Sequence, residues 1–141
     1  MTAFKPSILI VDDELSIREA FAMVLQDEYN ISMAASGEAA LKKIVDEKVD
    51  LVFLDIRMPG MDGIETLKQI KSIDDNIEVV MVTAVNDVQK ARQATALGSN
   101  NYIVKPFDVE QIINIAKQLA IKNVLKREVK SARDSINRDG I

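Results

Sequence analysis

The sequence predicts an α/β fold in which helices cover both faces of a doubly wound sheet of five parallel strands. Five short apolar runs, four of them rich in Val, Ile or Leu and without polar alternation, are typical of parallel strands buried on both faces. The runs alternate strictly with segments of helical period, which implies right-handed crossovers between the strands. The strands are expected at Ser7–Asp12, Asn30–Ala34, Asp50–Asp55, Glu78–Thr83 and Asn101–Val104.

One segment of helical period follows each strand. The second segment begins after Ser36 and the third at Asp62, and both residues are good N-caps because a side-chain oxygen can accept a backbone hydrogen bond. Glu65, three residues after Asp62, has the spacing of a capping box. The apolar stripes are Ile17, Ala20, Phe21, Val24 and Leu25 in the first segment, Ala40, Leu41 and Ile44 in the second, and Ile64, Leu67 and Ile70 in the third.

The fourth and fifth segments differ in apolar content and in length. The fourth, about Asn86–Leu97, has a thin apolar face, and Gly98 is placed to end it. The fifth begins at Asp108, and one helix over Asp108–Arg138 would be about 45 Å long and would project beyond a small domain. The apolar positions are Val88, Ala91, Ala94 and Thr95 in the fourth segment, and Ile112, Ile113, Ala116, Leu119 and Ala120 in the fifth.

The composition is that of a soluble globular protein with room for one domain. The chain has 141 residues, of which 48% are hydrophobic and 28% charged, and no apolar run approaches the roughly 20 residues that span a bilayer. Residues 1–6 lack the apolar stretch of a secretory signal, so we expect a cytoplasmic protein without membrane association. The absence of Cys and His excludes disulfides, thiol chemistry, imidazole general bases and imidazole metal ligands.

The C-terminal part differs from the rest in charge and pattern. Residues 1–116 hold 11 basic and 19 acidic side chains, whereas residues 117–141 hold 7 and 3. Because the basic tail lacks aromatic side chains and its net charge is modest, we expect no direct nucleic-acid binding. Its spacing is that of a short coiled coil or, alternatively, of a solvated, fraying terminus. The apolar positions of this seam are Leu125, Val129, Ala132 and Ile136.

Acidic, hydroxyl and ammonium side chains follow the predicted strands. Asp12 and Asp13 follow the first strand, Asp55 ends the third, Thr83 ends the fourth and Lys105 follows the fifth. We expect them to meet, because ligands of such sheets bind beyond the carboxyl ends of the strands. Two carboxylates about 4 Å apart repel by about 4 kcal/mol at an effective dielectric near 20. The cluster therefore favours a hard cation such as Mg²⁺, which prefers oxygen ligands.

Such a site would also attract a phosphoryl group. Its negative oxygens need the metal, the ammonium of Lys105 and a hydroxyl donor such as Thr83. Aspartate forms aspartyl phosphates as a nucleophile, so Asp55 could attack phosphorus.

These residues resemble the receiver domain of two-component response regulators, over about residues 7–122. The matching motifs are Asp12-Asp13, Asp55 within Leu-Asp-Ile-Arg-Met-Pro-Gly-Met-Asp-Gly, Thr83-Ala84 and Lys105-Pro106-Phe107. The resemblance implies a flavodoxin-like sheet with strand order 2-1-3-4-5. We expect a receiver domain at 1–122 and a helical extension or linker at 123–141. A homodimer could form through residues 108–138.

The resemblance also implies the role of each site residue. Asp55 would accept a phosphoryl group from a phosphohistidine on a histidine kinase or histidine phosphotransfer protein, because this chain has no histidine of its own. Asp13 and Asp55 would bind Mg²⁺ directly, Asp12 mainly through water, and the backbone carbonyl of Arg57 would supply another ligand. The Arg57 side chain would shield the aspartyl phosphate or hold one of its oxygens, which predicts slow hydrolysis.

The implied output is a conformational switch rather than turnover of a substrate. Lys105 would pair with the phosphoryl oxygens while Thr83 closes onto them, and Tyr102 would move inward as the switch aromatic. The Lys105–Pro106 bond would be cis. These changes would alter the surface of the fourth helix, fifth strand and fifth helix, which would bind a downstream effector protein or domain. The domain would assist its own phosphorylation and its slow autodephosphorylation.

Three other interpretations share the fold or the chemistry. A haloacid-dehalogenase-like phosphatase also uses a strand-end aspartate with Mg²⁺, but its motif needs a second aspartate where this chain has Arg57. A flavodoxin needs a Ser/Thr/Gly-rich phosphate loop where this chain has Asp12-Asp13-Glu14. The third interpretation is the N-terminal receiver fragment of a multidomain transcriptional or enzymatic regulator, with the tail as a dimerising linker.

Overall fold

The computed structural model describes residues 5–138 and contains one parallel sheet of five strands in the order β2-β1-β3-β4-β5, which confirms the predicted fold. The strands are β1 (Ser7–Val11), β2 (Asn30–Ala34), β3 (Leu51–Asp55), β4 (Glu78–Thr83) and β5 (Asn101–Val104). Asp12 and Asp50, predicted as strand ends, lie one residue outside β1 and β3, where each carboxylate accepts a backbone N–H. Residues 1–4 and 139–141, which belong to the predicted domain and extension, lie outside the described residues.

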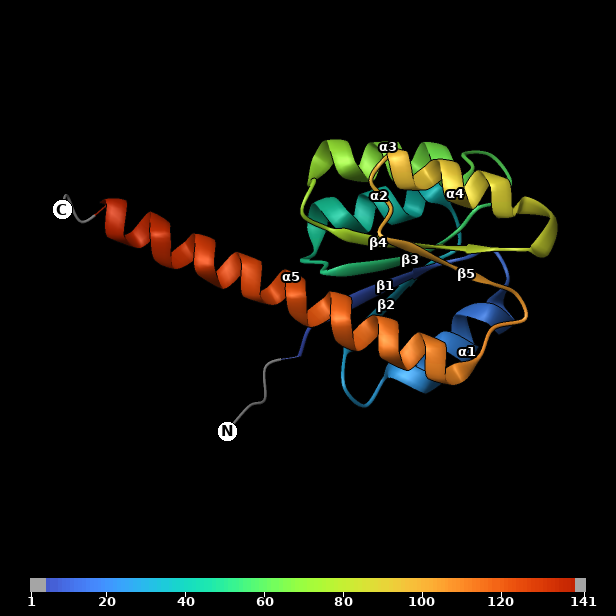
Figure 1. Ribbon diagram of the computed structural model, residues 1–141, viewed down its shortest axis with the longest axis horizontal. Coiled ribbons are helices and arrows are strands. Elements are labelled where there is room, and N and C mark those ends of the chain that lie inside the picture. Colours follow the sequence, from blue (N-terminus) through green and yellow to red (C-terminus); the bar gives the residue numbers. More distant parts are fainter. Residues whose placement is uncertain (1–4, 139–141) are drawn as a thin grey trace.

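The helices form two layers, one on each face of the sheet (Figure 1). They are α1 (Leu15–Leu25), α2 (Gly37–Asp46), α3 (Gly63–Ile73), α4 (Val88–Ala96) and α5 (Val109–Arg138). α1 and α5 cover one face, where Phe21 packs against Phe53 and Phe107 with ring centroids 5.0 and 4.8 Å apart. α2, α3 and α4 cover the other face, where strand side chains such as Val52 and Met81 are fully buried. None of the described helices is long and apolar enough to cross a membrane.

The predicted N-caps of α2 and α3 are present. The Ser36 hydroxyl accepts the N–H of Ala39 at 3.1 Å, and the Asp62 carboxylate accepts that of Glu65 at 2.9 Å. Each cap satisfies one of the unpaired donors at the start of its helix. The Asp62 cap therefore fixes where the loop after β3 ends and α3 begins.

The fourth predicted helix is divided into two pieces. Residues Val85–Asp87 form a 3-10 turn, η1, and α4 begins only at Val88. The N–H of Asp87 donates to the carbonyl of Ala84, three residues back, which is the hydrogen bond of a 3-10 turn. α4 presents a thin apolar face, as predicted, with Ala91 and Ala94 fully buried. Small contact residues allow such a helix to shift with little loss of packing.

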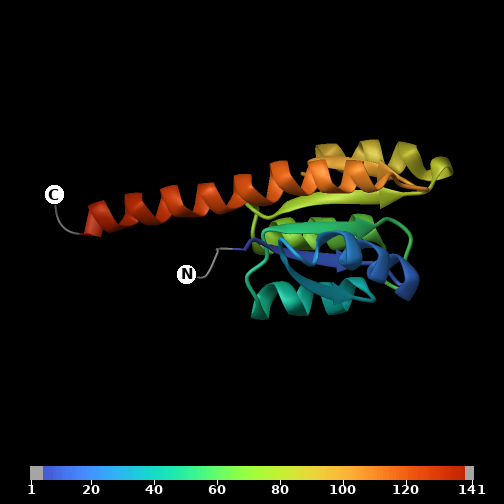
Figure 2. The same cartoon turned by 90° about the horizontal axis from the view of Figure 1, so that it is seen from below.

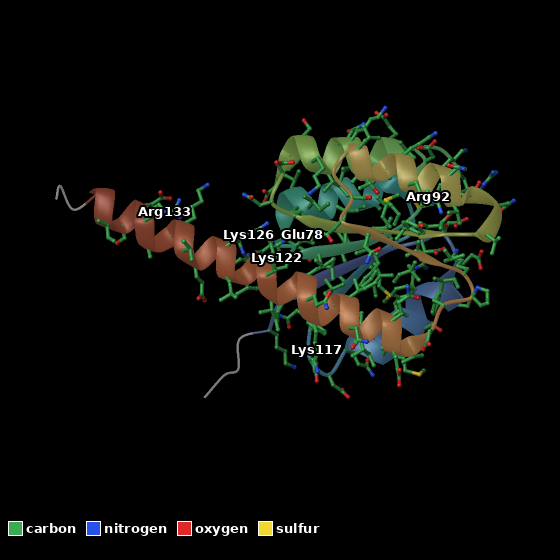
Figure 3. The ribbon with its side chains drawn as sticks, in the orientation of Figure 1. Glu78, Arg92, Lys117, Lys122, Lys126 and Arg133 are labelled. Atoms are coloured by element: carbon green, nitrogen blue, oxygen red, sulfur yellow. The ribbon has the colours of Figure 1, made fainter. Side chains whose placement is uncertain are left out.

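α5 is one helix of 30 residues, about 45 Å long, and its C-terminal part projects beyond the sheet (Figure 2). Where α5 still lies against the domain, ion pairs and a hydrogen bond join the helix to one end of the sheet. This end is opposite the carboxyl ends of the strands. The side chains of Asn123 and Arg127 contact the carboxylate of Asp50. The ammonium of Lys126 lies 3.3 Å from the carboxylate of Glu78, and both side chains are labelled in Figure 3. We call Asp50, Glu78, Asn123, Lys126 and Arg127 the basal latch.

Candidate functional site

The carboxyl ends of β1, β3 and β5 bring four predicted residues together. Carboxylate oxygens of Asp12, Asp13 and Asp55 all lie within 4.8 Å of one another. The ammonium of Lys105 lies 3.4 Å from Asp12 Oδ2 and 3.6 Å from Asp55 Oδ1. The Lys105–Pro106 bond is cis. One cation thus faces three anions, and the cluster keeps an excess of negative charge.

The two inner carboxylates are held by the sheet and the loops that follow it. Asp55 pairs with Val82 in the register of β3 and β4 and is buried, and Asp12 is buried beside it. Asp12 Oδ1 also accepts the N–H of Glu14 at 2.9 Å. Asp13 is exposed, so the cluster opens to solvent on its side. A ligand can therefore reach it from outside the molecule.

The start of α3 packs directly against the backbone of Asp55. A Cβ on Gly63 would lie 2.1 Å from the Asp55 carbonyl oxygen and 2.7 Å from Ile56 Cα. Glycine is therefore required at this position for close approach and not for an unusual backbone angle. The contact joins the capped start of α3 to the strand end that carries Asp55.

Burial and mutual repulsion determine the protonation of the cluster. Burial raises the pKa of Asp55 to about 6; the Asp12 carboxylate adds to the rise, while Lys105 and a backbone hydrogen bond from Arg57 oppose it. Burial also raises the pKa of Asp12. Burial lowers the pKa of Lys105, but Asp55 and Asp12 outweigh this effect, and its pKa lies above the usual value. A cation that binds here stabilises the ionised carboxylates.

Oxygen ligands, partial burial and excess negative charge fit a hard divalent cation such as Mg²⁺. The charge supplied by Lys105 alone leaves two negative charges uncompensated when all three carboxylates are ionised. The donor set contains no soft ligand, which fits the absence of Cys and His.

The two predicted switch residues lie on β4 and β5. Thr83 is buried, and its hydroxyl donates to the carbonyl of Ala84 at 3.1 Å. Tyr102 is half-buried and packs against the apolar layer under α2, α3 and α4. In this conformation the Thr83 hydroxyl is therefore bound to backbone.

The side chain of Arg57 has a partner that the sequence did not reveal. Its Nε and Nη2 atoms donate to the two carboxylate oxygens of Asp87, at 2.5 and 2.8 Å. The hydrogen bond from Arg57 lowers the pKa of Asp87. In the sequence, Asp87 only resembles a residue that begins a helix, and no spacing rule joins it to a residue 30 positions earlier.

The fold and the acidic cluster define a class of protein, and comparison with known proteins agrees. The family model of the response regulator receiver domain matches residues 8–117. The chain therefore belongs to the response regulator receiver domains, which are signalling domains.

The relatives include short and long proteins. Sporulation initiation phosphotransferase F of Bacillus subtilis is 42% identical over 112 residues, which are 79% of this chain and 90% of that protein. The transcriptional regulatory protein ZraR of Escherichia coli O157:H7 is 36% identical over 130 residues, 91% of this chain but only 30% of that protein. The solved structure of NtrX from Brucella abortus matches with a TM-score of 0.83 and 35% identity, over 90% of this chain and 30% of that one.

Proposed function

We propose that Asp55 accepts a phosphoryl group from the phosphohistidine of a partner histidine kinase or histidine phosphotransfer protein. The observation that best supports this function is the position of Asp55. Its carboxylate lies beside those of Asp12 and Asp13 and 3.6 Å from the ammonium of Lys105. An oxygen of Asp55 attacks phosphorus, a P–O bond forms and the P–N bond breaks. The bonding electron pair returns to the imidazole nitrogen of the donor.

The other residues of the cluster hold and neutralise the group. Lys105 pairs with the phosphoryl oxygens, and Thr83 gives up its hydrogen bond to Ala84 to donate to them. The residues that would hold Mg²⁺ are Asp13, Asp55, the backbone carbonyl of Arg57 and, mainly through water, Asp12. When bound, the metal supplies Lewis-acid stabilisation of the transferring oxygens. The phosphoryl group is then lost slowly by autodephosphorylation.

The proposed output is a change in the surface formed by α4, β5 and α5. Movement of Thr83 toward the site leaves space that Tyr102 fills from β5. The thin apolar face of α4 lowers the cost of the rearrangement. A downstream effector protein or domain binds differently to this surface in the phosphorylated and unphosphorylated states. A cytoplasmic location stays a prediction.

The domain organisation is also a proposal. We assign residues 1–122 to the receiver domain and 123–141 to a helical extension or linker. The projecting part of α5 and the match to about 30% of longer regulators support a receiver joined to further domains. Leu125, Val129 and Ile136 are more than half exposed on α5, which supports a homodimer through residues 108–138.

The first experiment is incubation with acetyl phosphate and Mg²⁺, followed by mass spectrometry of the intact chain. Wild type is expected to gain the mass of one phosphoryl group, and Asp55→Asn is expected to gain none. Asp27→Asn, at an exposed position on the α1 side, is the matched control and should behave as wild type. A phosphoryl group that remains in Asp55→Asn would overturn the assignment of Asp55.

A further inference from the structure

Arg57 and Asp87 join two elements that flank the site. Arg57 lies in the loop after β3, two residues beyond Asp55, and Asp87 ends the 3-10 turn that precedes α4. Their contact is a two-pronged ion pair, a geometry that is stronger and more directional than a single hydrogen bond. The pair therefore tethers the start of α4 to the phosphoacceptor loop.

The tether extends to the Thr83 hydroxyl through one carbonyl group. The carbonyl of Ala84 accepts both the N–H of Asp87, at 3.0 Å, and the hydroxyl of Thr83, at 3.1 Å. A displacement of Asp87 therefore disturbs the carbonyl group that accepts the Thr83 hydroxyl.

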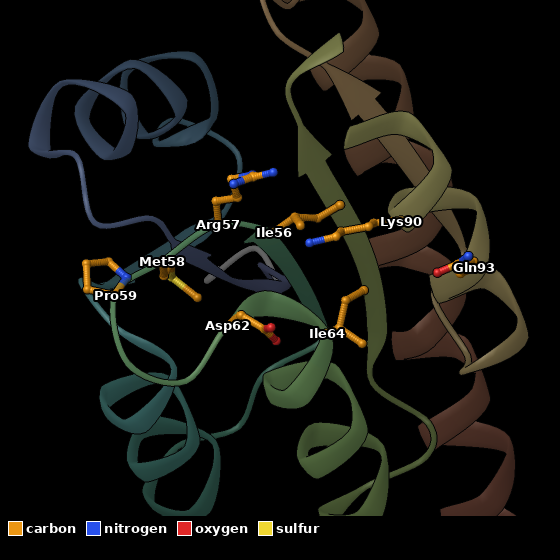
Figure 4. Close-up of a pocket in the computed structure, with 8 residues that line it drawn as sticks. All are labelled: Ile56, Arg57, Met58, Pro59, Asp62, Ile64, Lys90 and Gln93. Atoms are coloured by element: carbon orange, nitrogen blue, oxygen red, sulfur yellow. The ribbon is translucent and has the colours of Figure 1, made fainter. Parts of the chain in front are cut away.

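Arg57 is free to change partners, whereas Asp87 is not. The Arg57 side chain is 68% exposed, so it can swing without leaving a packed core, but that of Asp87 is only 4% exposed. Lys90 is the second cation that acts on Asp87, and its ammonium extends across the surface groove toward the loop that carries Arg57 (Figure 4). If Arg57 turns away, Asp87 keeps one neighbouring cation and loses its link to the loop.

We propose that Arg57 and Asp87 form a clasp that holds residues 83–87 in the resting position, and that Arg57 exchanges Asp87 for the phosphoryl oxygens on Asp55. This inference rests on the proposed function. The guanidinium of arginine matches a phosphoryl group as well as a carboxylate, and a phosphoryl group brings close to two negative charges. Opening of the clasp releases η1 and lets the Ala84 carbonyl and the Thr83 hydroxyl separate.

The test compares four forms of the full chain by backbone amide NMR: wild type, Asp87→Asn, Arg57→Gln and the control Arg92→Gln. Arg92 is an exposed cation on α4, close in sequence to the clasp but not part of it. Spectra are recorded before and during titration with beryllofluoride in the presence of Mg²⁺. Arg57→Gln changes an exposed side chain and gives a second variant if Asp87→Asn does not fold.

The clasp predicts opposite effects on the affinity for beryllofluoride. In Asp87→Asn the amides of residues 83–88 move, without ligand, toward their positions in liganded wild type, and the affinity rises about fivefold or more. Arg57→Gln moves the same amides but lowers the affinity, since the arginine contact with the ligand is lost. A pair with a merely structural role would change the affinity in the same direction in both variants.

The outcomes separate the clasp from the proposed function. If wild type binds beryllofluoride but Asp87→Asn behaves as Arg92→Gln does, the clasp is overturned and the assignment of Asp55 stands. If wild type binds no beryllofluoride, the proposed function and the partner exchange are both overturned. Movement of the Arg57 Nε–H resonance on binding, in wild type only and not in Asp55→Asn, supports the exchange directly.

Discussion

The ionisation of Asp55 depends on its surroundings more than on its residue type. The residue ends a buried strand, and Gly63 lets the start of α3 approach its backbone. Two neighbouring carboxylates oppose its ionisation, and one ammonium favours it. The site therefore combines a cost of ionisation with an attraction for cations, and both have measurable consequences.

The raised pKa predicts how stability depends on pH in the absence of Mg²⁺. The Asp55 pKa is about 6 in the folded protein, against an ordinary aspartate value of 3.8, so between these pH values the folded state holds a proton that the unfolded state has lost. The stabilising contribution of Asp55 is present below pH 3.8 and is lost as pH rises through 6. We expect Asp55→Asn to be more stable than wild type near pH 7.5, by on the order of 2 kcal/mol, with the difference shrinking toward pH 4.

Urea unfolding at several pH values measures this difference. Asp27→Asn serves again as control, because its difference from wild type should not follow the same course. Addition of Mg²⁺ should reduce the gap at pH 7.5, since a cation compensates the ionised carboxylates. A gap between wild type and Asp55→Asn that widens as pH falls would contradict the prediction.

At the scale of elements, α5 has a docked part and a projecting part. Asn123 is buried and Arg127 largely covered, whereas Leu125 and Val129 are exposed on the same stretch of helix. Burial works against the charges of the latch, because it raises the pKa of Asp50 and lowers that of Arg127. The net stabilisation by this ion pair is therefore smaller than its contact implies.

Removal of the latch contact should loosen α5 without unfolding the domain. In Arg127→Gln the carboxylate of Asp50 keeps the backbone N–H of Ser7 and the amide of Asn123 but loses its cation. We expect a loss of about 1–3 kcal/mol in the free energy of unfolding. Hydrogen exchange should become faster in α5 beyond about residue 120.

Arg133→Gln is the matched control for the latch, because Arg133 is exposed farther along the same helix. It should leave both stability and exchange close to wild type. Equal protection of α5 in Arg127→Gln and Arg133→Gln would show that the latch does not hold the helix.

At the scale of the whole molecule, the projecting part of α5 presents apolar side chains that the domain itself does not cover. Leu125, Val129 and Ile136 are 56%, 53% and 59% exposed, at the spacing of a coiled-coil seam. A second copy of the helix would bury them. The seam has fewer than three heptads, so we expect the association to be weak and concentration-dependent.

Sedimentation velocity at high protein concentration, with and without beryllofluoride, tests this association. We expect wild type to dimerise and the double variant Leu125→Glu/Val129→Glu to be monomeric. Ser131→Glu, on the same part of the helix but outside the seam, is the control and should dimerise as wild type does. Wild type that remains monomeric under both conditions would rule out the homodimer.

The sequence alone was sufficient to predict most of the fold. Strands and helices could be found from apolar period, and the caps at Ser36 and Asp62 from residue type and spacing. The division between η1 and α4 was missed, because a 3-10 turn and a helix start have the same residue pattern. The convergence of Asp12, Asp55 and Lys105 could be expected because parallel strands place their carboxyl ends at one edge.

The sequence by itself determined the class of fold, the family and the residues that gather at the carboxyl edge, because local period and strand direction encode them. Only the tertiary structure decided which charged side chains pair across the molecule. Arg57 with Asp87, and Asp50 with Arg127, are ion pairs between residues far apart in sequence, and each charge alone has the pattern of an ordinary surface residue. Such pairs depend on how loops and helix ends pack together in the folded protein, and a local sequence pattern does not predict this packing.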